Sequence, residues 1–321
     1  MNTRDIRKIT VLGGGIIGSS WSTYFLWKGL DVTIYDLNDE ALALARDRLA
    51  SNLAYLNEKK VISKSKANAF LKKAVFTSDI RDAMKSAQFV QESGPENYEV
   101  KQSLVAALDE HGPDDAIFAS STSGLLITEI AKFSKHPERC IGAHPYNPPH
   151  LIPLVEINRG ERTTPAFLLR AFGFYKSIGK EPIILKKEAL GFISNRLQIA
   201  LFREAVDLVL RGVCSVEDID KAVCYGPGLR FALMGPNMIF HLGGGKVGLK
   251  GLLEHVGPSI EMWLADMAVW KKFPEGSRDI LQKQVLEELA NRNPDEGNTE
   301  EEVLRWRDDM LIKLLQLLKR M

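Results

Sequence analysis

The 321-residue sequence lacks the features of secreted, membrane-spanning and nucleic-acid-binding proteins. It contains no apolar run of about 18 residues, as a membrane span requires, and its first residues contain no apolar signal-peptide core. Lys and Arg (42) balance Asp and Glu (41), so the net charge of +1 creates no strong field toward nucleic acid or a membrane. The three cysteines, Cys140, Cys214 and Cys224, do not have the spacing of a metal site. We therefore expect reduced thiols, no metal, no nucleic-acid or membrane partner and a cytoplasmic location.

Internal repeats and low-complexity tracts are absent as well. Hydrophobic residues make up 45% of the sequence and charged residues 26%, which are ordinary proportions for a globular protein. The length is large for one domain and sufficient for two, each with its own core.

The first half of the chain alternates short apolar segments with helical patterns. Residues 6–12 predict a strand that ends at a glycine cluster, residues 16–29 a helix, and residues 32–36 a second strand. Such a unit pairs its strands in parallel through a right-handed crossover. Two amphipathic helices are expected over 39–73, and further strands are expected over 89–92, 116–120, 140–143, 151–157 and 182–185.

From Glu188 onward the pattern is helical almost throughout. We therefore predict an α/β fold in which a Rossmann-type doubly wound sheet is followed by a smaller all-α domain. The predicted limits are 1–187 for the α/β domain, with a helical insertion near 39–73, and 188–321 for a helical substrate and dimerisation domain. A C-terminal extension from about residue 276 ends in a helix with an apolar stripe formed by Val303, Trp306, Met310, Leu314, Leu317 and Leu318.

Gly13 to Gly18 form the pattern Gly-x-Gly-x-x-Gly directly after a predicted strand and at the start of a predicted helix. In that context the pattern indicates a dinucleotide site. Gly13 permits the tight turn, Gly15 lets the backbone approach a pyrophosphate, and Gly18 lets the helix pack closely on the strand.

The helix start and an acidic residue complete the predicted cofactor site. Ile16 and Ile17 open the helix, whose free N–H groups and positive dipole end face the phosphates. Asp36 ends the second strand, where a carboxylate accepts hydrogen bonds from the ribose hydroxyls and repels a 2′-phosphate. We therefore expect NAD rather than NADP.

His144 lies in the sequence His-Pro-Tyr-Asn-Pro-Pro between two predicted strands, and Glu156 lies within the second of them. A histidine fixed on a stiff loop suits general-base work. A buried carboxylate needs a partner, and a histidine ring is a natural one. The alternatives are a structural histidine and a glutamate at a strand edge that faces water.

Ser123 and Asn195 are candidates for binding a substrate oxygen. Ser123 ends a run of four hydroxyl residues after a predicted strand, and Asn195 lies at the opening of a predicted helix. Because both positions also suit helix capping, the sequence leaves the two roles open.

These motifs together resemble the 3-hydroxyacyl-CoA dehydrogenase family over nearly the whole chain. The matching stretches are 11–19, 121–123, 144–148, 153–156 and 191–197, in the family's order and spacing. The resemblance implies that His144 is the catalytic base, that Glu156 is its paired carboxylate, and that Ser123 and Asn195 hydrogen-bond the reacting oxygen.

The resemblance also implies cofactor contacts and a homodimer. Glu96 and Lys101 match positions near the nicotinamide ribose, and Ser123 and Asn147 are assigned to the cofactor site as well. One departure is visible at Ser121, where the acyl-CoA enzymes usually have Asn. This departure argues against a CoA thioester as substrate.

Five stretches resemble the branch of the family that oxidises L-carnitine, namely 121–126, 136–140, 228–230, 242–258 and 305–309. This resemblance implies NAD-dependent oxidation of L-carnitine as the expected activity. Tyr146, Phe192 and Phe231 are candidates to hold its trimethylammonium group. The alternatives are L-gulonate, whose branch the chain also resembles, and a CoA ester such as 3-hydroxybutyryl-CoA, for which the six lysines within 59–73 are the best evidence. A non-catalytic role, as in crystallin-like or NAD-binding structural proteins, is a remote alternative.

Overall fold

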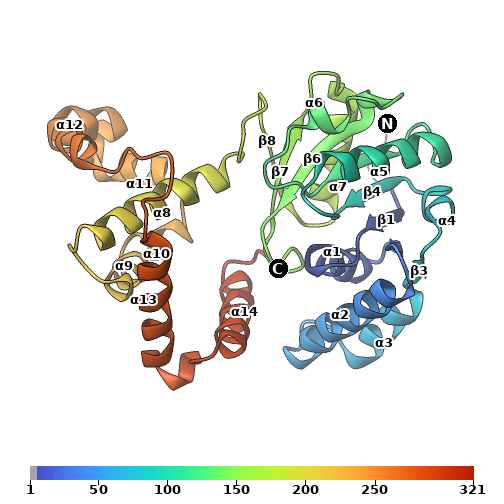
Figure 1. Cartoon of the computed structure of the whole chain (residues 1–321), viewed down its shortest axis with the longest axis horizontal. Helices are drawn as coiled ribbons and strands as arrows, with labels where there is room; N and C mark the ends of the chain where they lie inside the picture. Colours follow the sequence, from blue (N-terminus) through green and yellow to red (C-terminus); the bar gives the residue numbers. More distant parts are fainter. Residues whose placement is uncertain (1–5) are drawn as a thin grey trace. The chain divides into compact units, whose positions relative to one another are not determined.

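One sheet of eight strands organises the first part of the chain (Figure 1). The computed structural model describes residues 6–321, and within them the strand order is β3-β2-β1-β4-β5-β6-β7-β8. All neighbouring strands pair in parallel except β6 and β7, which are antiparallel. The strands are β1 (Lys8–Leu12), β2 (Asp31–Tyr35), β3 (Val75–Thr77), β4 (Phe89–Glu92), β5 (Ile117–Ser120), β6 (Cys140–Pro145), β7 (Leu154–Arg159) and β8 (Glu181–Ile184).

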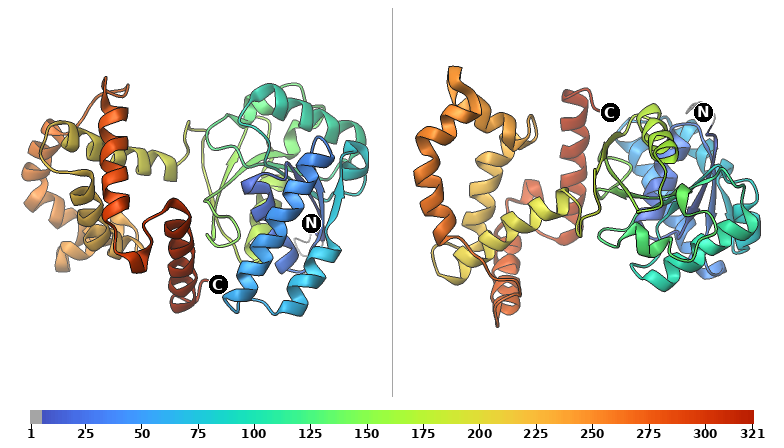
Figure 2. Two further views of the ribbon diagram at one scale, coloured as in Figure 1. Left: turned by 60° about the horizontal axis from the view of Figure 1, so that its bottom comes forward. Right: turned by 90° about the horizontal axis from the view of Figure 1, so that it is seen from above.

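Helices cover both faces of this sheet, as Figure 2 shows for the first unit. One hydrophobic core joins the sheet to α1 (Ile16–Trp27), α2 (Asp39–Glu58), α3 (Lys64–Lys73) and α7 (Pro165–Ser177). The other core joins it to α4 (Ile80–Met84), α5 (Tyr98–His111) and α6 (Ile127–Ile130). This doubly wound arrangement, followed by helices, confirms the predicted fold class.

The apolar patterns explain why these segments fold as they do. Ile9 and Val11 of β1 lie in one core, whereas Leu12 lies in the other, because alternate side chains of a strand point to opposite faces. Both faces of a doubly wound sheet are covered, so most of the residues in its strands are apolar. Asn38 caps α2 by accepting the N–H of Ala41, 2.9 Å away.

The chain forms two compact units that are described separately. The first runs to Asn195 and also contains Asp308–Met321, and the second is Arg196–Arg307. In the second unit α9 packs against α10 and α13, and α11 packs against α12. The helices from residue 194 onward are α8 (Ser194–Leu210), α9 (Val216–Tyr225), α10 (Pro227–Phe231), α11 (Pro236–Gly243), α12 (Gly248–Asp266), α13 (Ser277–Asn291) and α14 (Glu300–Leu317).

The last residues of the chain pack on the first unit, beside α2 (Figure 1). Asp309 accepts a hydrogen bond from the Tyr55 hydroxyl at 2.6 Å and forms an ion pair with Lys59 at 2.8 Å. Ile312 and Leu315 of α14 join the first unit's core. The apolar stripe predicted for this helix does not include these two residues, because the tertiary partner of an amphipathic helix is not visible in its own sequence.

Two local differences from the predicted elements have simple causes. The strand predicted over 151–157 begins at Leu154, since residues 148–153 contain three prolines and form a turn. Strand β3 was not predicted, because three residues are too few to show a period.

Residues 1–5, on which the predicted lack of a signal peptide partly rests, lie outside the described residues. Among residues 6–321, no helix has the length and apolar character needed to cross a bilayer.

Candidate active site

The glycine loop between β1 and α1 has the backbone geometry that its sequence predicts. Gly13 has a φ of +90°, and a Cβ there would lie 2.8 Å from the backbone oxygen of Ser93. A Cβ on Gly18 would lie 1.8 Å from the backbone oxygen of Gly13. Gly15 differs, because its φ is −64° and a Cβ would have no atom within 4 Å. The space beside Gly15 fits a pyrophosphate that approaches the backbone at the helix N-terminus.

Two further features border the same loop. Ile16 and Ile17 are the first residues of α1, so their N–H groups have no acceptor within the helix. Asp36 directly follows β2, and its two oxygens accept the N–H groups of Gly14 and Leu37, each at 2.8 Å. Each oxygen keeps a lone pair for a ribose hydroxyl. The loop and the carboxylate therefore fit NAD.

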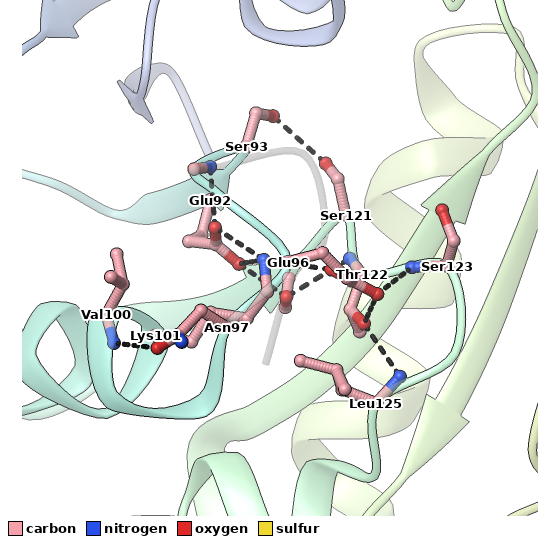
Figure 3. A network of polar contacts seen from close by, with 12 residues as sticks. Glu92, Ser93, Glu96, Asn97, Val100, Lys101, Ser121, Thr122, Ser123 and Leu125 are labelled. Carbon is pink, nitrogen blue, oxygen red and sulfur yellow. Dashed lines mark hydrogen bonds and ion pairs between the residues drawn. The ribbon is translucent and has the colours of Figure 1, made fainter.

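A buried network connects the ends of β4 and β5 to α5 (Figure 3). The Lys101 ammonium lies 2.9 Å from both carboxylate oxygens of Glu92, and both side chains are buried. Glu92 also accepts hydrogen bonds from the Ser120 hydroxyl at 2.5 Å and from the Gly94 N–H at 2.6 Å. Glu92 was not predicted as a site residue, although an acid in an apolar strand is the same signal that indicated Glu156.

Glu96 holds the serine-rich turn after β5 (Figure 3). One of its oxygens accepts hydrogen bonds from the Thr122 hydroxyl at 2.6 Å and from the N–H groups of Ser123 at 2.9 Å and Gly124 at 3.2 Å. Its other oxygen lies 3.4 Å from the Lys101 ammonium. Thr122, one of the four hydroxyl residues in the run that ends at Ser123, accepts the Leu125 N–H at 2.9 Å and so shapes the turn, whereas Ser123 is exposed.

His144 and Glu156 face each other across the antiparallel pair β6 and β7. They are directly opposite in the strand register, and His144 Nδ1 lies 2.8 Å from Glu156 Oε2. Both side chains are buried. Burial alone raises the pKa of the Glu156 carboxyl, but hydrogen bonds from His144 and Ser194 outweigh it and hold that pKa below its usual 4.5. The pairing of Nδ1 leaves Nε2 as the nitrogen that can take a proton.

The start of α8 supplies further donors to Glu156. Its Oε1 accepts the N–H groups of Ile193 at 3.0 Å and Ser194 at 2.9 Å, and the Ser194 hydroxyl donates to Oε2. Ser194 was not singled out from the sequence, because a serine at a helix start is most often a simple cap. Here its hydroxyl shares the carboxylate oxygen that binds His144.

Asn195, the next residue, reaches Ser123. Its Nδ2 donates to the Ser123 backbone oxygen at 3.0 Å. Because Ser194 contacts Glu156, these two adjacent residues bring the serine-rich turn and the His144–Glu156 pair to the same place. The second N–H of the Asn195 amide is available to a substrate oxygen.

The aromatic candidates fall into two groups. The rings of Phe192 and Tyr146 have centroids 5.5 and 6.0 Å from that of His144, so both lie beside the predicted base. Phe231 lies on α10 in the second unit and is 47% exposed. Asn147 is exposed on the loop after His144.

Comparisons with known proteins agree with this geometry. The NAD-binding domain of 3-hydroxyacyl-CoA dehydrogenase matches residues 8–189, and the C-terminal domain of the same enzyme matches residues 191–301. The chain belongs to the 3-hydroxyacyl-CoA dehydrogenase family. Members are NAD-dependent oxidoreductases, and NAD is therefore the cofactor of this chain.

Individual proteins are similar to this chain over nearly its full length. An L-carnitine dehydrogenase of Oceanobacillus iheyensis is 37% identical, covering 98% of this chain and 99% of its own. A 3-hydroxyacyl-CoA dehydrogenase of Gibberella moniliformis is 36% identical, covering 99% and 97%. A solved 5-formyl-3-hydroxy-2-methylpyridine 4-carboxylic acid 5-dehydrogenase, described as an NAD⁺-dependent dismutase, has a TM-score of 0.79 at 30% identity and covers 98% of both chains.

Proposed function

We propose that this member of the family oxidises the 3-hydroxyl group of L-carnitine to the ketone 3-dehydrocarnitine and reduces NAD to NADH. The observation that carries the proposal is the buried His144–Glu156 pair, joined through Ser194 and Asn195 to Ser123. This set combines a base, a group that orients it, and donors for the oxygen on which the reaction takes place.

In this proposal His144 Nε2 removes the proton of the substrate hydroxyl. The imidazolium that forms is stabilised by the Glu156 carboxylate, which already binds Nδ1. The Ser123 hydroxyl and the Asn195 amide donate to the reacting oxygen. When bound, NAD supplies the acceptor for the hydride that leaves carbon 3. A base placed in this way contributes roughly 10²–10⁴-fold to the rate.

Two observations support L-carnitine as the substrate. The similar L-carnitine dehydrogenase covers nearly all of this chain. Tyr146 lies beside His144 and is partly exposed, and an aromatic face is a good partner for a trimethylammonium group, whereas Phe192 is buried. A CoA ester, as the name of the Gibberella relative suggests, and L-gulonate are the alternatives.

The test is NAD reduction followed at 340 nm, with L-carnitine, L-gulonate and 3-hydroxybutyryl-CoA at equal concentration. We expect turnover with L-carnitine to exceed turnover with the other two substrates. A preference for gulonate or the CoA ester would be consistent with the proposed oxidation mechanism and would refute L-carnitine as the substrate. No turnover with any of the three, despite intact NAD binding, would refute the enzymatic role and favour a crystallin-like or other NAD-binding protein.

The role of the base has its own test. His144→Ala is expected to lose turnover and to retain NAD binding, because the proposed cofactor contacts come from other residues. Near-normal turnover in this variant would exclude His144 as the base.

We also propose a cytoplasmic homodimer that forms through the helical unit. The proposal of a dimer is supported by large apolar side chains on α8 that are exposed in the single chain, namely Leu197, Ile199, Leu201 and Phe202. A monomer in analytical ultracentrifugation at micromolar concentration would contradict it. The predicted domain limits and the substrate-binding role of the helical domain remain predictions.

A further inference from the structure

A cavity of about 310 Å³ lies in the first unit, at the C-terminal end of α1. It is separate from the glycine loop, which lies at the other end of the same helix. Ligand sites in proteins begin at about this volume. The wall is formed by Tyr24, Trp27, Lys28, His150, Leu151, Pro153 and Gly179–Glu181, and by the last three residues, 319–321.

The lining is rich in cations and poor in acids. Lys28, Lys180, Lys319 and Arg320 contribute to it, whereas Glu181 is the one acidic residue among the described residues that line it. The Glu181 carboxylate is already paired with Lys176 at 2.6 Å. Within residues 6–321, neither Lys28 nor Lys180 has a carboxylate at ion-pair distance. The cavity therefore brings together two lysines, Lys28 and Lys180, that have no carboxylate at ion-pair distance among residues 6–321.

Lys180 is the central feature of the wall. Its side chain is fully buried, although buried lysines are normally paired with an acid. The ammonium instead donates to the backbone oxygens of Pro149 and Ile152, and it lies 3.9 Å from the centroid of the Tyr24 ring. Burial and the nearby Lys28 charge lower the pKa of Lys180 well below 10.5, and burial lowers that of Lys28. An anion in the cavity would offset both effects.

We propose that this cavity binds a small anion, a carboxylate or a phosphate, between Lys28 and Lys180. The rings of Tyr24 and Trp27 form an apolar wall beside the two ammonium groups. Lys180 is also bonded to the loop that connects His144 to Glu156, through the carbonyls of Pro149 and Ile152. Because the anion binds Lys180, it also acts on this loop and changes the kcat or KM of the oxidation reaction.

The experiment titrates inorganic phosphate, and separately succinate, into the full-length protein by calorimetry. Ionic strength is fixed with chloride, and saturating NAD is present so that the glycine loop is occupied. We expect binding in the millimolar range or tighter. Stronger binding of phosphate identifies a phosphate site, and stronger binding of succinate identifies a carboxylate site.

Lys28→Gln and Lys319→Gln test the location of the site without removing the buried Lys180. Each is expected to weaken binding, Lys28→Gln by about tenfold or more, because a charge-assisted contact is lost. Lys246→Gln removes an exposed lysine in the second unit and is the matched control. No binding to the natural protein, or equal weakening in all three variants, would show an adventitious ion only and overturn the site. Unchanged kcat and KM at saturating anion would overturn its effect on the loop.

Discussion

Replacement of Gly15 by alanine should affect the stability of the fold and the affinity for NAD in different ways. The three glycines of the loop are equivalent in the sequence pattern but not in the structure. A Cβ at Gly18 would overlap the Gly13 backbone oxygen, whereas a Cβ at Gly15 would point into space that contains no protein atom within 4 Å. The backbone φ of Gly15, −64°, is also one that alanine adopts without strain.

The two effects of Gly15→Ala therefore have opposite signs. Alanine restricts the unfolded chain, which raises the free energy of unfolding by about 0.4–1 kcal/mol. In a protein of this size that corresponds to an increase in Tm of about 1–4 °C. If a pyrophosphate occupies the open space, the methyl group crowds it at a cost of about 1–3 kcal/mol, and the Kd for NAD rises about 5- to 150-fold.

The assay combines thermal unfolding without NAD with calorimetric titration of NAD. Gly257→Ala on α12 is the matched control, because a Cβ there also meets no atom within 4 Å. It should raise Tm and leave NAD affinity unchanged. Gly18→Ala should fail to fold or unfold at a much lower temperature. An unchanged Kd for NAD in Gly15→Ala would refute the close approach of the pyrophosphate to this residue.

Three further predictions concern the acidic residues. Glu156→Gln should lower kcat about 10- to 150-fold through loss of a charged hydrogen bond. Urea titrations should show a lower free energy of unfolding for this variant than for the natural protein. The difference should be full above pH 4.5 and should shrink as the pH falls through the lowered pKa of the Glu156 carboxyl. A difference that does not depend on pH would contradict the pairing of Glu156 with His144. Asp36→Asn keeps an acceptor for the Gly14 N–H but removes the negative charge that repels a 2′-phosphate. The kcat/KM with NADP should therefore rise relative to the kcat/KM with NAD. An unchanged ratio of these two values would exclude Asp36 as the residue that selects NAD. Glu92→Gln should cost about 3–5 kcal/mol in urea unfolding because Lys101 loses its buried partner, and Lys101→Met in the same chain should recover part of this loss.

The sequence was sufficient for the parts of the fold that depend on local pattern. The glycine motif directly follows a strand and opens a helix, as is typical of dinucleotide sites, and this context predicted the start of the sheet. The return of Asp308–Met321 to the first unit was not predictable, because it depends on contacts of Asp309 with Tyr55 and Lys59, about 250 residues away.

In the candidate site, too, some features were predictable from the local sequence and others depend on tertiary contacts. The pairing of His144 with Glu156 was predictable, because a histidine near prolines and an acid in an apolar strand are unusual in sequence. Glu92 carried a comparable signal, but its partner Lys101 lies on a helix, and the sequence did not indicate that the two would meet. Ser194 carried no signal, since only the fold brings its hydroxyl to the oxygen that His144 also contacts.

The His144–Glu156 pair depends on the one antiparallel step in the sheet. Residues that are directly opposite in an antiparallel pair have Cβ atoms about 4.5–5.5 Å apart, which suits a direct contact between an imidazole and a carboxylate. Two strands joined by the short segment 146–153 can only be antiparallel, because a parallel connection requires a crossover of a dozen or more residues. The register is equally critical, since a shift by one residue would move Glu156 to the other face of the sheet. The stiff, proline-rich loop therefore does more than connect β6 to β7: it places the acid opposite the histidine.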